Sequence, residues 1–220
     1  MKNHHKTLQL IEIFASIQGE TRFSGLPTTF IRLAACNLRC SWCDTTYSFG
    51  RGDTWEIDVI IQKVIENGCK YVCITGGEPL LQSNVHLLMK ELCDLGYQLS
   101  IETGGSLSTE AIDPRVTVIL DIKCPGSGMH EKNYWANLPH LRPDDEVKFV
   151  ISHEEDYLYA KDICLKYQLF EKVNNVLFSP VFNVLHPQKL VEWILKDKLS
   201  SVRLNLQLHK FIWDPLTKGV

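Results

Sequence analysis

Apolar runs of strand length alternate with segments of helical periodicity along most of the chain. Residues 71–74 form a short, continuously apolar run, which is typical of a strand covered on both faces. By similar reasoning, strands are predicted at residues 28–34, 71–74, 98–102, 116–120, 147–151, 176–178 and 202–206. Strands that alternate with helices favour a parallel sheet with right-handed crossovers.

Helical signals follow four of these predicted strands. Apolar positions 57, 60, 61, 64 and 65 obey the i, i+3, i+4 rule of an amphipathic helix, and positions 87, 88, 92 and 95 indicate a second one. The predicted boundaries are Gly68 as a C′ glycine, Ser83 as an N-cap with Gly96 closing that helix, Ser152 and Glu155 as a capping box, and Pro187 opening a helix through Leu195.

The number of helices decides the fold class. The stretches after Glu102 and after Lys123 look like loops where a barrel helix is missing, so the chain holds too few helices for a complete eight-fold barrel. We therefore expect an incomplete, TIM-like α/β barrel of six or seven strands, formed as a single domain by residues 1–220. An open doubly wound sheet is the alternative.

Composition and charge narrow the class of protein. The chain has 220 residues, 45% hydrophobic and 22% charged, as in globular proteins with a sizeable core. The net charge of −3 gives no electrostatic reason to bind nucleic acid or an anionic membrane. No apolar segment has the length of a signal peptide or a membrane span, so a cytoplasmic location without membrane attachment is expected.

Cys36, Cys40 and Cys43 form a C-x3-C-x2-C motif directly after the first predicted strand. Closely spaced cysteines hold iron–sulfur clusters, and a 4Fe-4S cluster takes four ligands. Three ligands leave one iron open, and an open iron can bind a small molecule. A zinc site is the alternative, but the motif lacks the second cysteine pair or the paired histidines of most structural zinc sites.

The remaining cysteines and the terminal histidines predict no further metal site. Cys124 lies in a loop with proline and glycine neighbours, and as a fourth cluster ligand it would block the open iron. His4 and His5 are expected to be a solvated pair at the chain terminus. Four cysteines within apolar runs are expected to be small core residues: Cys69, Cys73, Cys93 and Cys164.

Polar and glycine-rich residues follow several predicted strands, and the carboxyl ends of parallel strands meet at one mouth of a barrel. Gly76, Gly77, Glu78 and Pro79 follow the strand at residues 71–74. The two glycines permit positive φ or a close backbone approach to a ligand, and the carboxylate can accept hydrogen bonds from an ammonium group. A tight turn between a strand and a helix explains this sequence equally well when it is taken alone.

The cysteine motif, followed one βα unit later by Gly-Gly-Glu-Pro, resembles the radical S-adenosylmethionine (SAM) enzymes. The resemblance implies that the open iron binds the amino and carboxylate groups of SAM, and that reductive cleavage gives a 5′-deoxyadenosyl radical. It also implies that the glycine-rich turn binds the methionyl amine. The implied SAM contacts are Trp42, Cys43, Asp44, Gly77, Glu78, Asp121, Ile122, Lys123, Ser179, Pro180, Val181 and Phe182.

A narrower resemblance rests on several short blocks in a fixed order. Residues 16–21 (SIQGET), 30–33 (FIRL), 36–38 (CNL), 43–45 (CDT) and 207–213 (QLHKFIW) are similar to the 7-carboxy-7-deazaguanine synthases, radical SAM lyases of queuosine biosynthesis. This resemblance implies 6-carboxy-5,6,7,8-tetrahydropterin as substrate, 7-carboxy-7-deazaguanine as product, loss of ammonia, and Mg2+ on the Thr45 hydroxyl. The implied substrate contacts are Ile17, Gln18, Gly19, Arg32, Thr75 and Pro215.

The chemistry of these side chains agrees with a carboxylated pterin. Gln18 and the neighbouring backbone can pair with a pyrimidine edge, and Arg32 can hold a carboxylate through two parallel hydrogen bonds. Glu102 and His209 are candidate catalytic residues for proton transfer, although both residue types are also common structural hydrogen-bonders. Pro215 marks where the family's tail closes over the substrate, but this chain continues for five residues beyond it.

Two other functions remain open on these residues. One is a radical SAM enzyme that installs a glycyl radical on a protein, and the other is a non-catalytic metal- or cluster-binding module. For the synthase reading, the resemblance implies a homodimer. That reading also requires a reductant such as a flavodoxin.

Overall fold

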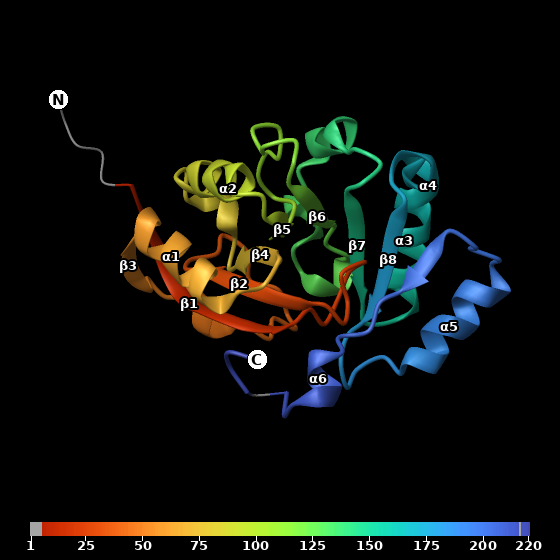
Figure 1. Ribbon diagram of the computed structural model, residues 1–220. Helices are drawn as coiled ribbons and strands as arrows, with labels where there is room; N and C mark the ends of the chain where they lie inside the picture. The colour runs from red at the N-terminus through yellow and green to blue at the C-terminus, as the bar shows by residue number, and fades with distance from the viewer. Residues whose placement is uncertain (1–5, 216) are drawn as a thin grey trace.

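The computed structural model describes residues 6–215 and 217–220, which build a curved nine-stranded sheet (Figure 1). Its spatial order is β3-β1-β2-β4-β5-β6-β7-β8-β9. His4 and His5, expected to be solvated, lie outside the described residues. The strands are β1 (Thr7–Ile17), β2 (Pro27–Leu33), β3 (Asp53–Glu56), β4 (Tyr71–Gly76), β5 (Gln98–Thr103), β6 (Thr117–Asp121), β7 (Glu146–Ile151), β8 (Asn175–Pro180) and β9 (Val202–Leu204).

Seven of these strands, β2 and β4 to β9, are parallel to one another and correspond to the seven predicted from sequence. Their spatial order follows chain order, so the crossovers all run in the same direction around the sheet. A doubly wound sheet reverses this order at a switch point, and here no reversal occurs among the described strands. The sheet curves without closing, which confirms the incomplete barrel.

The helices are α1 (Ile57–Asn67), α2 (Val85–Asp94), α3 (Glu154–Lys166), α4 (Leu169–Lys172), α5 (Pro187–Lys196) and α6 (His209–Ile212). Right-handed crossovers in one direction place the connecting helices on the outer face of the sheet, as Figure 1 shows for α2, α3 and α4. The expected loss of two barrel helices is confirmed. Residues 104–116 contain no helix, and residues 122–145, likewise all described, contain only short 3-10 helices: η3 (Pro125–Ser127), η4 (His130–Lys132) and η5 (Trp135–His140).

Strands β1 and β3 are absent from the sequence prediction. They extend the sheet beyond β2 in the antiparallel direction, with β1 between β2 and β3. In the first half of β1, Leu8 and Leu10 alternate into the core, but the burial alternation stops in the second half. That half lines a cavity through Phe14 and Ile17, so its residues lack the regular pattern of a strand that covers an apolar core.

Two helix starts differ from the predicted ones. Helix α2 begins after Asn84 rather than Ser83, and the Asn84 amide donates to the carbonyl of Thr7 at 2.9 Å, which joins α2 to β1. Helix α3 begins after His153, and the carboxylate that accepts from the N–H of Ser152 belongs to Asp156 rather than Glu155. Asp156 also accepts the Gly126 N–H at 2.7 Å, so in both cases the polar residue that occupies the position is the one with a tertiary contact. Gly68, with φ 68°, is the predicted C-cap of α1.

Buried apolar side chains from the sheet and the helices form one continuous core. Leu88, Met89 and Leu92 of α2 are fully buried where the helix packs on the sheet. Phe149 of β7 and Phe178 of β8 are fully buried side chains of the sheet itself. Among the four cysteines expected in the core, three are buried and the fourth is half-buried. The buried ones are Cys73, Cys93 and Cys164, and the half-buried one is Cys69.

The loop from residue 18 to residue 26 crosses the inside of the open barrel. Its Thr21 N–H donates to Asn205 Oδ1 at 2.8 Å, and Arg22 Nη2 donates to Thr117 Oγ1 at 3.0 Å. The Arg22 N–H donates to the buried carboxylate of Glu146 at 3.0 Å. Burial raises the pKa of Glu146 to about 7, although the Arg22 hydrogen bond and charge oppose the shift. The loop therefore ties β1 to β6, β7 and the segment after β9.

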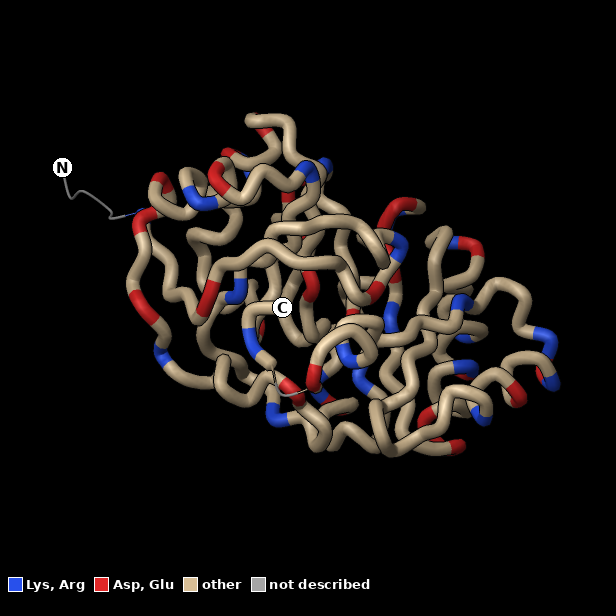
Figure 2. Tube along the Cα trace, turned by 60° about the horizontal axis from the view of Figure 1, so that its bottom comes forward, with Lys and Arg blue, Asp and Glu red and all other residues tan. Residues whose placement is uncertain are grey.

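Acidic and basic residues are interspersed along the chain trace (Figure 2). Inside the barrel, residues of opposite sign pair directly: Lys148 with Glu20 and Lys123 with Asp121. None of the described helices is long and apolar enough to cross a membrane.

Truncation of a core side chain tests the packing of α2. Leu88→Ala removes a fully buried side chain and leaves a cavity, so the free energy of unfolding should fall by about 2–5 kcal/mol. Leu195→Ala is the matched control, because Leu195 of α5 is 70% exposed and should change stability by less than about 0.5 kcal/mol. Denaturant unfolding followed by circular dichroism measures both, and similar values would contradict the core assignment.

Glu146 gives the fold a pH dependence. The folded state holds this proton more tightly than the unfolded chain does, so the contribution of Glu146 to unfolding free energy decreases as pH rises from about 4.5 to about 7. The decrease is on the order of 2–3 kcal/mol. Glu146→Gln should abolish it and stabilise the protein at pH 8 relative to wild type. Urea unfolding between pH 5 and 8, with exposed Glu110→Gln as control, tests this; an unaltered profile in Glu146→Gln would refute it.

Candidate active site

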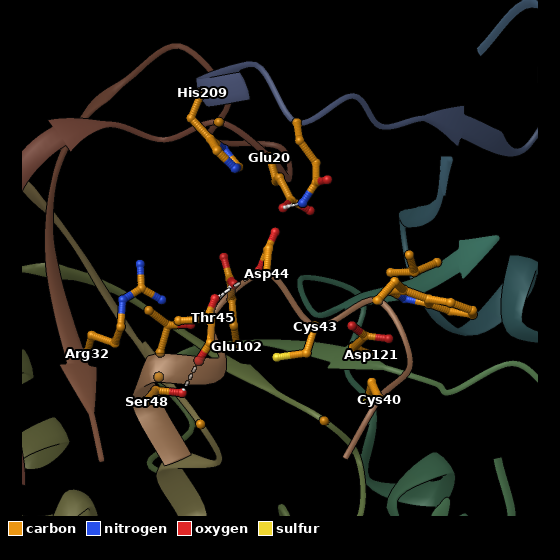
Figure 3. Close-up of a pocket in the computed structure, with 18 of the residues that line it drawn as sticks. Glu20, Arg32, Cys40, Cys43, Asp44, Thr45, Ser48, Glu102, Asp121 and His209 are labelled. Atoms are coloured by element: carbon orange, nitrogen blue, oxygen red, sulfur yellow. Dashed lines mark hydrogen bonds between the residues drawn. The ribbon is translucent and has the colours of Figure 1, made fainter. Parts of the chain in front are cut away.

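A cavity of about 790 Å3 lies inside the barrel, toward the carboxyl ends of the parallel strands. Figure 3 shows Cys40, Cys43 and Asp121 on one side of it and Arg32 and Thr45 on the other. Glu20 and His209 lie along a third side, where the segment after β9 approaches the loop after β1. The strand ends therefore bring sulfur, acidic and basic groups from distant parts of the sequence to one enclosed space.

The cysteine loop leaves β2 through Ala35, which has a φ of 72° and donates its N–H to the Ser48 carbonyl at 2.8 Å. Cys36, Cys40 and Cys43 are free, half-buried thiols that line the cavity. Burial raises the pKa of Cys36 and of Cys40, and the nearby ammonium of Lys123 opposes both shifts. Ligation by iron would deprotonate these thiols.

The donor set fits a cluster better than a single ion. In the described part of the chain, no three His, Cys, Asp or Glu side chains are close enough to hold one metal ion. As they stand, the three thiols therefore form no preassembled site for a single ion, whereas a 4Fe-4S cluster takes its thiolates from around a larger body. Cys124 is 1% exposed, lies in the apolar core and does not line the cavity, in agreement with the prediction that it is not a ligand.

The Gly-Gly-Glu-Pro turn packs against the start of the cysteine loop. Gly76 has a φ of 140°, and a Cβ on Gly77 would overlap the backbone carbonyl of Ala35. These glycines are therefore needed because another part of the protein backbone, at Ala35, lies against them. Glu78 is fully buried and its carboxylate accepts from Thr103 Oγ1 at 2.9 Å and from the Gly104 N–H at 2.8 Å. This carboxylate ties the turn to the end of β5 and does not line the cavity.

Gln18 and Thr75 meet Glu102 at the back of the cavity. Gln18 Nε2 donates to Glu102 Oε1 and the Thr75 hydroxyl to Glu102 Oε2, both at 3.4 Å. The Gln18 backbone is already paired with the loop itself, through Leu26 and Gly25. The two side chains and the carboxylate therefore present a row of donors and acceptors at hydrogen-bonding distance from one another.

Arg32 is aimed by an acidic neighbour on the adjacent strand. Its Nε donates to Glu12 Oε1 at 2.7 Å, and the Tyr47 hydroxyl donates to the same oxygen at 2.8 Å. Burial raises the pKa of Tyr47 to about 12, with the Glu12 hydrogen bond acting in the same direction and Arg32 opposing it. Nη1 and Nη2 of Arg32 form no hydrogen bond with any described residue, and the side chain lines the cavity. Two parallel donors are thus free for an anionic ligand.

Two charged residues that sequence reasoning missed form a buried ion pair on the cavity wall. Lys148 Nζ is 3.1 Å from Glu20 Oε2, and Gln207 Nε2 donates to Glu20 Oε1 at 3.0 Å. Burial alone would raise the pKa of Glu20, but Lys148 and Gln207 outweigh it and the pKa falls below its ordinary value. A lysine within the apolar strand 146–151 is the same signal that identified Arg32, and it could have identified Lys148.

The last helix contacts the cysteine loop. Lys210 Nζ is 2.6 Å from Asp44 Oδ2, and the Thr45 hydroxyl donates to Asp44 Oδ1 at 2.8 Å. Burial raises the pKa of Asp44, but Lys210 dominates and brings it to about 2. Burial lowers the pKa of His209, although Glu20 and Asp44 oppose the shift. The shift favours the neutral imidazole, the form that can accept a proton.

Most of the residues expected from sequence are brought together here. Glu78, Ile122, Ser179 and Pro180 do not line the cavity, and all four are buried. Those that line it are Ile17, Gln18, Gly19, Arg32, Cys36, Cys40, Trp42, Cys43, Asp44, Thr45, Thr75, Gly77, Glu102, Asp121, Lys123, Val181, Phe182, His209 and Pro215.

Comparisons with known proteins agree with this geometry. Residues 30–119 match the Radical SAM superfamily, the class that the open barrel and its cysteine loop define. The crystal structure of QueE from Escherichia coli has a TM-score of 0.75 at 23% identity, covering 93% of this chain and 96% of that one. SuiB from Streptococcus suis bound to S-adenosylmethionine has a TM-score of 0.55 at 14% identity, covering 78% of this chain and 44% of that one. These two matches concern the fold.

Sequence relatives define the family more narrowly. The 7-carboxy-7-deazaguanine synthase of Chlorobaculum tepidum is 45% identical over 216 residues, which are 97% of each chain. That of Koribacter versatilis is 43% identical over 97% of this chain and 100% of its own. The chain therefore belongs to the 7-carboxy-7-deazaguanine synthase family. This membership sets aside the glycyl-radical activating enzyme and the non-catalytic module.

Gly19 tests how closely the last segment approaches the loop after β1. A Cβ on Gly19 would overlap the His209 imidazole, so Gly19→Ala should displace His209 and lower kcat/KM by at least about 100-fold. Gly50→Ala is the control, because its Cβ would meet only the Tyr47 carbonyl at 3.9 Å. Steady-state kinetics of both purified variants measure the effect. Equal kcat/KM values for the two would show that the close packing of Gly19 against His209 is not needed for activity.

Proposed function

We propose that this chain is a radical SAM lyase that converts 6-carboxy-5,6,7,8-tetrahydropterin to 7-carboxy-7-deazaguanine with loss of ammonia, in queuosine biosynthesis. Family membership over nearly the whole chain supports the reaction. The observation that carries it is the arrangement of one cavity, with three free thiols on one side and the free Nη donors of Arg32 on the other. A carboxylated small molecule would thus lie beside the cluster, within reach of a radical formed there.

Cys36, Cys40 and Cys43 would ligate the 4Fe-4S cluster and leave one iron for SAM. When bound, the cluster and SAM supply the abstraction of a hydrogen atom from the substrate. We propose that Gly77, Asp121, Lys123, Val181 and Phe182, which all line the cavity, contact SAM. Asp121 Oδ1 is buried and has no hydrogen-bond partner among the described residues, which suits an acceptor for a hydroxyl or amine of the ligand. Trp42 and Asp44 also line the cavity and are further proposed contacts. Glu78, Ile122, Ser179 and Pro180 are buried behind the cavity wall, so we propose that they support these contacts from behind.

On the opposite side we propose that Arg32 binds the substrate carboxylate through Nη1 and Nη2 while Glu12 fixes the guanidinium plane. Gln18, with the backbone of Ile17 and Gly19, would pair with the pyrimidine edge, and Thr75 would contact the same ring. Pro215, which also lines the cavity, would cover the outer side. These groups orient the substrate; none of them needs to change protonation state.

Proton transfers are assigned to two ionisable groups that line this cavity, Glu102 and His209. The lowered pKa of His209 favours the neutral imidazole, which can accept a proton at a ring nitrogen. Glu102 is held by Gln18 and Thr75 and can accept or return a proton at a carboxylate oxygen. We propose both as catalytic residues that act after hydrogen abstraction, when the ring contracts and ammonia leaves.

We propose that Thr45 ligates Mg2+ through its hydroxyl. This oxygen lines the cavity beside the Asp44 carboxylate, and Mg2+ prefers oxygen ligands while it retains several waters. Substrate oxygens and water would complete the coordination. The Asp44 carboxylate, already paired with Lys210, contributes negative charge next to the ion.

We further propose that residues 1–220 form one radical SAM core domain, that the protein is a cytoplasmic homodimer, and that a flavodoxin-like protein reduces the cluster. These proposals rest on the family resemblance. The flavodoxin-like reductant is also supported by the chemistry, because reductive cleavage of SAM needs one electron. No role for nucleic acid or a membrane is proposed, because the net charge of −3 provides no attraction to either.

Anaerobic reconstitution tests the function. The protein is loaded with iron and sulfide and incubated with SAM, dithionite, Mg2+ and 6-carboxytetrahydropterin. Mass spectrometry should detect 5′-deoxyadenosine and 7-carboxy-7-deazaguanine, and Cys40→Ala should abolish both because the cluster loses a ligand. Cys69→Ala, at a half-buried cysteine outside the cavity, should retain both.

Each alternative result has a distinct meaning. Deoxyadenosine without deazaguanine, from a fully loaded protein, would retain the radical chemistry and reject the pterin substrate. Neither product from such a protein would reject the proposed function.

A further inference from the structure

Asn205, in the segment after β9, joins two parts of the cavity wall without lining the cavity itself. Its side chain is buried and fully hydrogen-bonded: Oδ1 accepts the Thr21 N–H at 2.8 Å, and Nδ2 donates to Ser179 Oγ at 2.7 Å and to Glu20 Oε2 at 3.1 Å. Its own N–H donates to the Phe178 carbonyl at 2.9 Å. One amide thus connects the loop that carries Gln18 and Gly19 with the end of β8.

The residue that Asn205 holds is strained. Thr21 has a φ of 67°, in the left-handed region that β-branched residues rarely enter. Such a conformation persists only where surrounding contacts determine it. Thr21 is 1% exposed, and its hydroxyl accepts the Phe23 N–H at 3.2 Å, but that contact lies within the loop. The Asn205 amide oxygen is the partner outside the loop that accepts the Thr21 N–H.

This strained residue follows the proposed substrate contacts within three positions. The Gln18 N–H donates to the Leu26 carbonyl and the Gly25 N–H to the Gln18 carbonyl, so the loop closes on itself as one unit. Its placement in the cavity then depends on contacts that leave it. At Thr21, an extended backbone would change the direction of the chain at the point where Gln18 and Gly19 must face the ligand.

We propose that Asn205 is a positioning residue, which holds Thr21 in its left-handed conformation and thereby sets Gln18 and Gly19 against the substrate. The proposal rests on the proposed function, since it concerns the same pterin site. Asn205 contacts no reacting atom and acts through the loop. Its bond to Ser179 keeps the loop in register with the end of β8, beside the proposed SAM contacts Val181 and Phe182.

Substitution of Asn205 in the wild-type protein and in a Thr21→Gly variant distinguishes a positioning role of Asn205 from a role in packing alone. Asn205→Ala should raise KM for 6-carboxytetrahydropterin about tenfold and lower kcat less, because the loop loses its hold on the substrate. Thr21→Gly alone should change KM less than about twofold, since glycine adopts positive φ without strain. In the Thr21→Gly background, Asn205→Ala should raise KM less than about threefold. The exposed Asn174→Ala is the matched control.

An equal rise of KM in both backgrounds would overturn the proposal, because Asn205 would then contribute packing alone. An unchanged KM in Asn205→Ala would overturn it as well. If Asn205→Ala does not fold, Asn205→Ser replaces it in both backgrounds; its hydroxyl is one bond shorter than the amide oxygen that Thr21 reaches.

Hydrogen exchange of the protein without substrate gives a second readout that is independent of turnover. Amides of residues 18–26 should exchange at least about tenfold faster in Asn205→Ala, and close to the wild-type rate when Thr21→Gly is also present. Unchanged exchange in Asn205→Ala would overturn the proposal. Absence of deazaguanine from the wild-type enzyme would instead refute the proposed function, and the exchange experiment would still decide the role of Asn205.

Discussion

The buried ion pair between Glu20 and Lys148 is the contact on which the site depends. The sheet does not close, so something other than strand pairing must hold its first loop to the strands on the far side. Removal of one member of a buried ion pair typically costs several kcal/mol, because the other charge loses its nearest counter-charge. Gln207 and Asn205 donate further hydrogen bonds to the Glu20 carboxylate. The loop after β1 and the segment after β9 are therefore both held by this ion pair, which serves as their common anchor.

With that anchor in place, the cavity separates two kinds of chemistry. The cysteine loop and Lys123 define a side suited to a cluster and a zwitterionic cofactor, and Arg32, Gln18 and Glu102 define a side suited to a planar, carboxylated ligand. The last helix closes the space between them through the ion pair of Lys210 with Asp44. Radical chemistry requires such enclosure, because a reactive intermediate exposed to solvent would be lost to side reactions.

Sequence reasoning predicted the parallel strands because residues buried on both faces give continuous apolar runs. It missed β1, whose second half lines a cavity, and it misplaced the starts of α2 and α3. In those helices two neighbouring polar residues compete, and contacts of Asn84 with Thr7 and of Asp156 with Ser152 decide the outcome. Among site residues, Arg32 could be predicted from its place in an apolar strand. Asn205 could not, because its role depends on an unusual backbone angle at a residue far away in the sequence.

The amino-acid sequence by itself determined the class of fold, the cysteine motif and the glycines of the turn after β4. These follow from local spacing, periodicity and backbone freedom, which need no knowledge of distant contacts. Only the tertiary structure decided that the Glu78 carboxylate faces Thr103 rather than the cavity, and that Glu20, Lys148 and Asn205 form one network. The partners of a buried polar side chain come from segments more than 100 residues apart here, and the crossing of the open barrel by one loop brings them together.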